Sequence, residues 1–510
     1  MTNTVVLDGH LDAATVAAIA SGARVELDPT ALDGVAENRA VLEQLITAGT
    51  PIYGITTGFG ALVSERVAPE FQRRLQVNLL RSHAAGTGAD LAREVVRGAM
   101  AVRVSSLLRG YSGVRPILLE RVVQFLNAHL VPRVPRSGSL GASGDLAPSA
   151  HAFLPLIGEG EVTDGAGRRL SGADALERLG LDPLALEAKE GLALINGTHF
   201  MAATGALLTV RARALLDTID LVCACTLDAL RGATAAFDPR VHAIRGLRGQ
   251  SQSATNILCA VSGSSRVSGP AGARLQDAYS LRCAAQVHGA AREAFAFFAD
   301  LVAVDLNAVT DNPITFRDPE PAVISAGNFH GQSLALAFDT LRLALADLGA
   351  ISERRTFRLV SPSLNGVLPA FLSPTPGASN GYMIAQYSAA ALVAELRALA
   401  QPVSIDNIPT SDNQEDHVSM GMTAAVMALE SVERLERVVA FELICACQAF
   451  DLDPGAPGHL IAVVHAAVRE RVPPLTEDRP PAEDVRGVES LVREGRLADL
   501  LAHARASVAA

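Results

Sequence analysis

Five long stretches rich in alanine and leucine follow Gly197, and they limit the possible fold more than any other feature. Each stretch is apolar around much of its circumference at helical spacing, so it needs neighbours on several sides. A bundle of long helices supplies those neighbours. We therefore predict a mainly α protein with a long central bundle. Its helices are expected at Thr198–Leu230, Leu281–Ala308, Gln332–Arg355, Ala378–Ala400 and His417–Phe450.

The first part of the chain is made of shorter segments with frequent loops. A stretch around Asp164 and Gly165 alternates in polarity and predicts a small β-hairpin. We expect residues 1–196 to form a smaller, loop-rich N-terminal domain and residues 197–510 to form the central and C-terminal bundle. Shorter helical patterns lie near Asp12–Ala20, Val35–Ala48, Pro69–Arg81 and Asp90–Arg109.

Composition narrows the class of partner. The net charge is -11 and only 4% of residues are aromatic, without a basic run, which argues against nucleic acid and favours a small molecule. Six cysteines in 510 residues do not make a disulfide framework, and the N-terminus lacks the basic and apolar regions of a signal peptide. We expect a cytoplasmic protein.

One uncharged stretch could be interpreted as a membrane span, and two cysteine pairs could be interpreted as metal ligands. The sequence favours neither interpretation. Gly191–Val210 carries no charged residue, but the polar residues from Asn196 to His199 interrupt it, so a buried helix fits better than a membrane span. The pairs Cys223/Cys225 and Cys445/Cys447 lie in helical patterns, where residues two apart point to nearly opposite sides. We expect buried structural thiols and no metal site.

The segment GSLGASGDLAPSAH, from Gly138 to His151, places glycines around an Ala-Ser-Gly tripeptide. A phosphate-binding loop is disfavoured because Asp145 follows the glycines and would repel phosphate. A nucleophilic serine is disfavoured because the segment is not G-x-S-x-G. A plain turn between helices explains the glycines but not the tripeptide.

A chemical interpretation explains the tripeptide as well. Gly144 has no Cβ, so its nitrogen can approach the carbonyl carbon of Ala142 and close a ring. Loss of one water from that ring and of a second from Ser143 leaves an imidazolone with an exocyclic methylidene. That carbon is an electrophile, which no unmodified side chain provides.

GSLGASGDLAPSAH resembles the motif of the aromatic amino acid ammonia-lyases, whose prosthetic group, 4-methylidene-imidazol-5-one (MIO), forms from Ala-Ser-Gly. The resemblance continues, in the family's order, through YGITTGFG, RSHAAGTG, KEGLALINGT, QDAYSLRC, DNPITF, GNFHGQ and NQEDHVSMG. It implies the mainly α fold shared with fumarase and aspartase, a homotetramer with active sites shared between subunits, and no external cofactor. The expected prosthetic group comes from Ala142, Ser143 and Gly144.

The resemblance also assigns residues. Tyr53 corresponds to the catalytic tyrosine, which needs positive charge or hydrogen bonds nearby to act as a base at neutral pH. Tyr279 corresponds to a second catalytic tyrosine and Arg282 to the arginine that binds the substrate carboxylate. The other residues expected near the substrate are Asn196, Gln276 and Phe329.

Two further positions address the substrate ring. The pair Ser82-His83 resembles histidine-specific members, and lyases acting on phenylalanine or tyrosine commonly lack a glutamate at the position of Glu415. A carboxylate can accept a hydrogen bond from an imidazole N–H. Together, His83 and Glu415 favour L-histidine, deaminated to trans-urocanate and ammonia.

Alternatives remain open at this stage. The chain departs from the usual histidine-specific pattern at His199, where glutamine is frequent, at Ser149 in place of a common leucine, and at Ala278 and Ala285 in place of prolines. A tyrosine or phenylalanine ammonia-lyase, or a 2,3-aminomutase, would use the same prosthetic group. A catalytically silent structural protein is a third possibility, which the retained tripeptide and Tyr53 disfavour.

Overall fold

The computed structural model describes residues 4–268, 275–453 and 455–509. Helices dominate it, so the predicted mainly α class is confirmed. Contacts divide the chain into two compact units. Unit 1 consists of the chain up to Val210 with Phe298–Asp339 and Pro402–Val426, and unit 2 of Arg211–Phe297, Thr340–Gln401 and the chain from Met427 onward. The domain boundary predicted after residue 196 stays a prediction.

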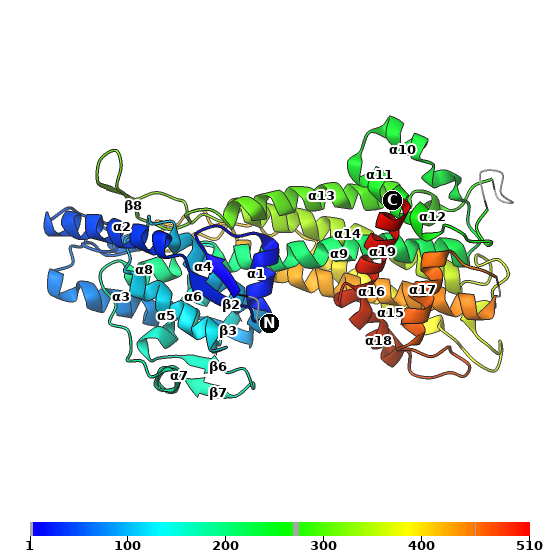
Figure 1. The fold of residues 1–510 in the computed structure, drawn as a ribbon, viewed down its shortest axis with the longest axis horizontal. Coiled ribbons are helices and arrows are strands. Elements are labelled where there is room, and N and C mark those ends of the chain that lie inside the picture. Colours follow the sequence, from blue (N-terminus) through cyan, green and yellow to red (C-terminus); the bar gives the residue numbers. More distant parts are fainter. Residues whose placement is uncertain (1–3, 269–274, 454, 510) are drawn as a thin grey trace. The chain divides into compact units, whose positions relative to one another are not determined.

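Unit 1 begins with two strands and a helix. Strands β1 (Thr4–Leu7) and β2 (Arg24–Leu27) pair in parallel, and α1 (Ala13–Ala20) connects them. The side chain of Asp12 accepts the Thr15 N–H and so caps α1. Helix α4 (Arg93–Leu108) is buried along most of its length. It packs against α1, α2 (Pro29–Thr47) and α5 (Pro116–Asn127) (Figure 1).

Three short helices of unit 1 pack against one another and support the candidate site described below. They are α3 (Pro69–His83), α6 (Ala147–Phe153) and α8 (Glu190–Ile195). Proline stands in the first turn of α3 and of α6, where its missing N–H costs no helical hydrogen bond.

Small antiparallel sheets lie in the rest of unit 1. The predicted hairpin is confirmed as β6 (Glu161–Thr163) and β7 (Arg169–Ser171). Helix α7 (Gly172–Leu179) follows β7 directly. The strands outside this hairpin were not predicted from the sequence. These are β1, β2, β3 (Thr87–Asp90), β4 (Val131–Pro132), β5 (Pro135–Ser137), β8 (Ile314–Phe316) and β9 (Ala322–Ile324).

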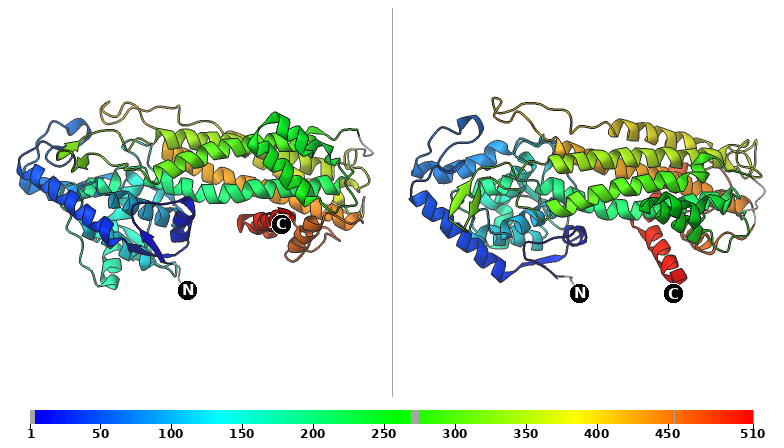
Figure 2. Two further views of the ribbon diagram at one scale, coloured as in Figure 1. Left: turned by 45° about the horizontal axis from the view of Figure 1, so that its top comes forward. Right: turned by 90° about the horizontal axis from the view of Figure 1, so that it is seen from above.

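Four long helices contribute residues to both units, close to where the sequence predicts them: α9 (His199–Ala229), α13 (Ala284–Asp305), α14 (Gln332–Val360) and α16 (Gly421–Leu452). Within unit 2 they run side by side (Figure 2). Glu442 of α16 accepts hydrogen bonds from Thr226 of α9 and Arg355 of α14. The remaining helices of unit 2 are α10 (Pro239–Arg245), α11 (Arg248–Ala260), α12 (Tyr279–Arg282), α15 (Met383–Leu399), α17 (His459–Arg469), α18 (Pro481–Arg493) and α19 (Arg496–Ala509).

The two cysteine pairs singled out in the sequence are buried, as predicted. Cys223, Cys225, Cys445 and Cys447 are buried free thiols, and burial raises the pKa of each. Among the described residues there is no cluster of three or more histidine, cysteine, aspartate or glutamate side chains that could hold a metal ion. In the same part of the chain, no helix is long and apolar enough to cross a bilayer.

Candidate active site

A cavity of about 300 Å³ in unit 1 brings together five of the residues singled out in the sequence. Tyr53 comes from the loop after α2, His83 from the end of α3, Ser143 from the loop before α6, and Asn196 from the end of α8. Glu415 comes from the loop before α16. Segments that are distant in sequence therefore meet around one pocket, as the resemblance implies.

The Ala142-Ser143-Gly144 tripeptide forms a tight turn at this pocket. The N–H of Gly144 donates to Gly141 O at 3.3 Å, and Ser143 has a left-handed φ of 49°. Gly144 has a φ of 86°, and a Cβ on it would lie 2.2 Å from the carbonyl oxygen of Gly197. Only glycine fits there. The turn thus has the residue types and the close backbone packing that ring closure requires.

Tyr53 lies on a glycine-rich loop at the edge of the pocket. Its hydroxyl accepts the Gly60 N–H at 3.1 Å, and its ring packs edge-on against Phe59, with 5.9 Å between centroids. Burial raises the pKa of Tyr53, which the Gly60 hydrogen bond lowers and the charge of Glu415 raises further. The surrounding protein therefore favours the neutral phenol.

His83 is held in one tautomer. Its Nδ1 lies 2.9 Å from the carbonyl oxygen of Leu79. A carbonyl oxygen can only accept, so Nδ1 carries the hydrogen. Burial lowers the pKa of His83, which favours the neutral ring. His83 Nε2 then presents a lone pair, and no described residue donates to it.

Glu415 closes a tight loop. Thr410 and Glu415 exchange two backbone hydrogen bonds, and the loop between them contains three residues in the left-handed region, Ser411, Asp412 and Asn413. The Thr410 hydroxyl donates to Glu415 Oε2 at 3.0 Å, and Ser143 Oγ lies 3.4 Å from Oε1. The carboxylate is thereby aimed at the tripeptide.

Asn196 is 2% exposed, and its Oδ1 has no hydrogen-bond partner within the described part of the chain. An unpaired buried acceptor at a pocket wall is costly in free energy. A ligand with an N–H or O–H group would satisfy it. Asn196 is thus suited to the substrate contact that the sequence predicts.

Six predicted site residues do not line this cavity, and two of them, Ala142 and Gly144, flank Ser143 in the turn. Phe329 is half-buried in the loop between β9 and α14 of unit 1. Gln276, Tyr279 and Arg282 belong to unit 2, where the Arg282 guanidinium lies over the Tyr279 ring, 4.6 Å from its centroid. Tyr279 is 70% exposed, so its ring is available to a partner. The roles predicted for these residues stay predictions.

The sequence did not single out the apolar wall of the cavity. Phe59 and Gly60 lie within the segment YGITTGFG, and Leu192 and Ile195 lie three residues apart on α8. The motifs that contain these four residues could therefore have indicated that they line the pocket. No sequence pattern indicated Ser411, because only the conformation of its loop brings it to the pocket. The other wall residues that were missed are Leu79 and Leu146.

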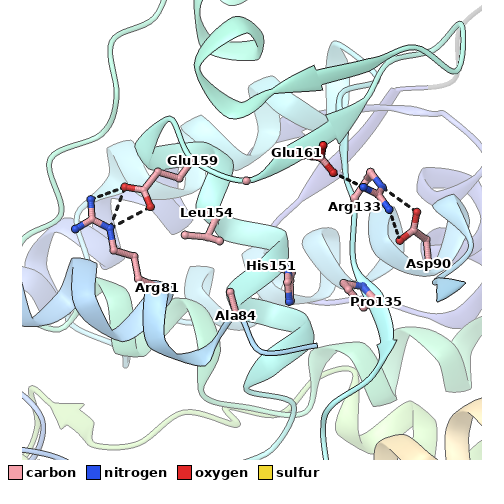
Figure 3. Close-up of a pocket in the computed structure, with 10 residues that line it drawn as sticks. Arg81, Ala84, Asp90, Arg133, Pro135, His151, Leu154, Glu159 and Glu161 are labelled. Atoms are coloured by element: carbon pink, nitrogen blue, oxygen red, sulfur yellow. Dashed lines mark hydrogen bonds and ion pairs between the residues drawn. The ribbon is translucent and has the colours of Figure 1, made fainter. Parts of the chain in front are cut away.

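A second cavity in unit 1, of about 470 Å³, differs from the first in its charges. Figure 3 shows Arg81 paired with Glu159 on one side, and Arg133 between Asp90 and Glu161 on the other. Both arginines are already paired with carboxylates, and none of the predicted site residues lines this cavity. The cavity around Ser143 is the better candidate.

Comparisons with known proteins show the family of the chain. The family model for aromatic amino acid lyases matches residues 11–470. The chain is 50% identical to the histidine ammonia-lyase of Symbiobacterium thermophilum over 495 residues, which is 97% of each chain.

Solved structures give the same result. The crystal structure of histidine ammonia-lyase from Trypanosoma cruzi matches with a TM-score of 0.91 and 38% identity, covering 98% of this chain and 95% of that one. The tyrosine aminomutase of Streptomyces globisporus matches with a TM-score of 0.92 and 35% identity, covering 98% of both.

Proposed function

The chain belongs to the aromatic amino acid lyase family, and from this premise we propose that it deaminates L-histidine to trans-urocanate and ammonia. The joint placement of His83 and Glu415 at the pocket that holds Ser143 carries this proposal. Identity of 50% to a histidine ammonia-lyase over nearly the whole chain supports it.

The residues present fit the prosthetic group of this family. We propose that Ala142, Ser143 and Gly144 form MIO, because the turn is tight and Gly144 packs where no Cβ fits. The group supplies an electrophile that activates the substrate for loss of ammonia. Asn196 and Gly197, next to the turn, would hold it in place.

Tyr53 is the proposed base that removes the β-proton. The residues of unit 1 that line the cavity around its hydroxyl include no lysine or arginine, and burial raises the pKa of Tyr53. The substrate brings positive charge in its α-ammonium group, which favours the phenolate once it is bound. The glycine-rich loop that carries Tyr53 suits a lid that excludes water during this step.

His83 and Glu415 explain the choice of histidine. His83 Nε2 and Glu415 Oε1 are both acceptors; a neutral substrate imidazole can donate its one N–H to either, and an imidazolium can donate to both. A phenyl ring has no hydrogen-bond donor and would leave both acceptors unpaired, which costs free energy in a buried site. Phenylalanine is therefore expected to bind less well.

The rest of the site is proposed to come from a neighbouring subunit of a homotetramer. Gln276, Tyr279 and Arg282 would then complete the pocket, with Arg282 binding the substrate carboxylate and Tyr279 taking part in catalysis. The exposure of Tyr279 supports this arrangement. Phe329 is proposed to lie near the electrophile. We also propose a cytoplasmic location, supported by six cysteines without a disulfide.

Two measurements test the proposal together. The intact mass of the purified protein should be lower by two waters, and peptide mapping should place the loss at Ala142 to Gly144. Incubation with histidine, tyrosine and phenylalanine separately should give product with histidine at the highest kcat/KM. Preference for tyrosine or phenylalanine, or recovery of a β-amino acid, would overturn the assignment to histidine deamination.

A further inference from the structure

A buried hydrogen bond joins α6 to α9 directly behind the tripeptide. Ser149 Oγ lies 2.8 Å from His199 Nε2, and neither side chain is more than 1% exposed. The His199 ring packs between Phe153 and Phe200, with 6.1 and 5.6 Å between centroids. Both residues depart from the common family pattern, and here they contact each other.

Backbone contacts already tie the same two segments together. The Asp145 N–H donates to Gly197 O at 2.8 Å, and the Gly197 N–H donates to Ser143 O at 3.3 Å. The Phe200 N–H donates to Asp145 Oδ2 at 2.6 Å. The tripeptide is thus held against residues 197–200, and the Ser149–His199 bond is an additional link between side chains.

The hydrogen bond also orients His199. Burial lowers the pKa of His199 well below its usual value, so the ring is neutral and carries one N–H. His199 Nδ1 lies 3.8 Å from Asp145 Oδ2, an oxygen that already accepts the Phe200 N–H. An Nδ1–H facing that oxygen attracts it, whereas a lone pair there would repel it. The favourable arrangement therefore has Ser149 donating to Nε2 and Nδ1–H facing Asp145.

We propose that Ser149 and His199 are positioning residues for the cyclisation of Ala142-Ser143-Gly144: they orient Asp145 and keep residues 143–145 pressed against Gly197. The proposal rests on the proposed function, because it requires that the tripeptide cyclise. In that reaction the Gly144 nitrogen bonds to the Ala142 carbonyl carbon, and the carbonyl oxygen leaves as water with the amide hydrogens of Ser143 and Gly144. The second water takes the Ser143 hydroxyl and its Cα hydrogen.

Three variants separate positioning from packing. In His199→Gln the amide oxygen can still accept from Ser149 and the amide N–H can still face Asp145, so cyclisation should proceed at the wild-type rate. His199→Leu removes both functions, and Ser149→Ala removes the donor. Thr204→Ala is the matched control, because Thr204 lies buried on α9 and, among the described residues, its hydroxyl donates to Phe200 O of the same helix alone.

The readout is the loss of two waters, followed by intact mass during timed cell-free synthesis, with the melting temperature of each product measured in parallel. We expect Ser149→Ala and His199→Leu to mature at least about fivefold more slowly than Thr204→Ala, as loss of one buried hydrogen bond implies. His199→Gln should match the wild type.

Equal maturation rates in Ser149→Ala and Thr204→Ala would overturn the proposal, and this comparison stands even if His199→Leu does not fold. A slow His199→Gln variant would also contradict it, because the amide keeps the acceptor for Ser149 and an N–H that can face Asp145. A wild-type chain that loses no water would instead refute the proposed function, and this inference would fall with it.

Discussion

The candidate pocket of unit 1 and the polar centre of the helical bundle in unit 2 both bury charged and polar groups, but they differ in how those groups are paired. In the bundle, Glu442 accepts hydrogen bonds from Thr226, Ser352 and Arg355, at 2.6 to 3.0 Å. In the pocket, Glu415 has one good side-chain donor, Thr410, at 3.0 Å. The carboxylate of Glu442 is therefore fully paired within the bundle, whereas that of Glu415 keeps capacity for a further donor.

The same contrast applies to the histidines. His288 in unit 2 uses both ring nitrogens, with Nδ1 2.7 Å from Asp220 and Nε2 3.2 Å from Arg355. His83 in the pocket uses Nδ1 alone. Burial of charge alone therefore does not distinguish these two regions, whereas the unused hydrogen-bonding capacity of Glu415 and His83 at the pocket, against the full pairing of Glu442 and His288, does. Substitutions in the pocket should affect turnover, and substitutions in the bundle should affect stability.

The largest expected effect on turnover is that of Ser143→Ala. Alanine is as small as serine and fits the turn, so the variant should fold with a melting temperature close to that of the wild type. Without the hydroxyl it cannot form the methylidene and should lose nearly all lyase activity. Intact mass and a urocanate assay on the same sample check this, and an active Ser143→Ala enzyme would exclude the prosthetic group.

Tyr53→Phe should follow, with kcat lower by at least about 10²-fold, in the usual range for loss of a general base. The phenyl ring keeps the packing against Phe59, so KM should change much less. Steady-state kinetics over a range of pH measure both. Near-normal turnover with an unchanged pH profile would show that another residue removes the β-proton.

Glu415→Gln should have a smaller and more selective effect. A charge-assisted hydrogen bond of about 1.5 to 3 kcal/mol would be weakened or lost, so kcat/KM for histidine should fall roughly 10- to 100-fold. Phenylalanine cannot use the carboxylate and should be affected little. Comparing the two substrates in one variant controls for general damage, and equal losses for both would make Glu415 a structural residue.

The long helices and the family could be predicted from the sequence, each for a physical reason. The long helices were predictable because apolar periodicity extends over many turns, as in α9 and α14. The family was identifiable because the motif around Ser143 is long and its chemistry needs those residue types. Helix α15 begins at Met383 rather than near Ala378, since a turn with a bridge between Pro376 and Ser379 precedes it.

Other features depend on contacts that a linear pattern does not contain. The strands β1 and β2 are four residues each, too short for alternation to stand out. The hydrogen bond from Thr410 to Glu415 depends on a loop with three left-handed residues, Ser411 among them. His199 and Ser149 were visible only as two separate departures, and their contact came from the fold.

The smallest effect on catalysis is expected in the bundle, for Asp220→Asn. Asp220 accepts hydrogen bonds from Asn256, His288 and Arg292, and although burial raises its pKa, Arg292 and His288 lower it to about 2. An unfolded aspartate has a pKa near 3.8, so the folded chain resists protonation. The carboxylate therefore contributes stability that is complete above about pH 4 and is lost as the pH falls to about 2.

The Asp220→Asn variant should have a lower melting temperature than the wild type at pH 7, and this difference should narrow in acid. Its kcat/KM per folded enzyme should stay within about twofold of the wild-type value, whereas loss of a catalytic group costs about 10²-fold or more. If the difference in melting temperature stayed constant down to pH 2.5, the Asp220 carboxylate would not be the source of this stability. A large fall in kcat/KM would show that Asp220 serves catalysis and not only stability.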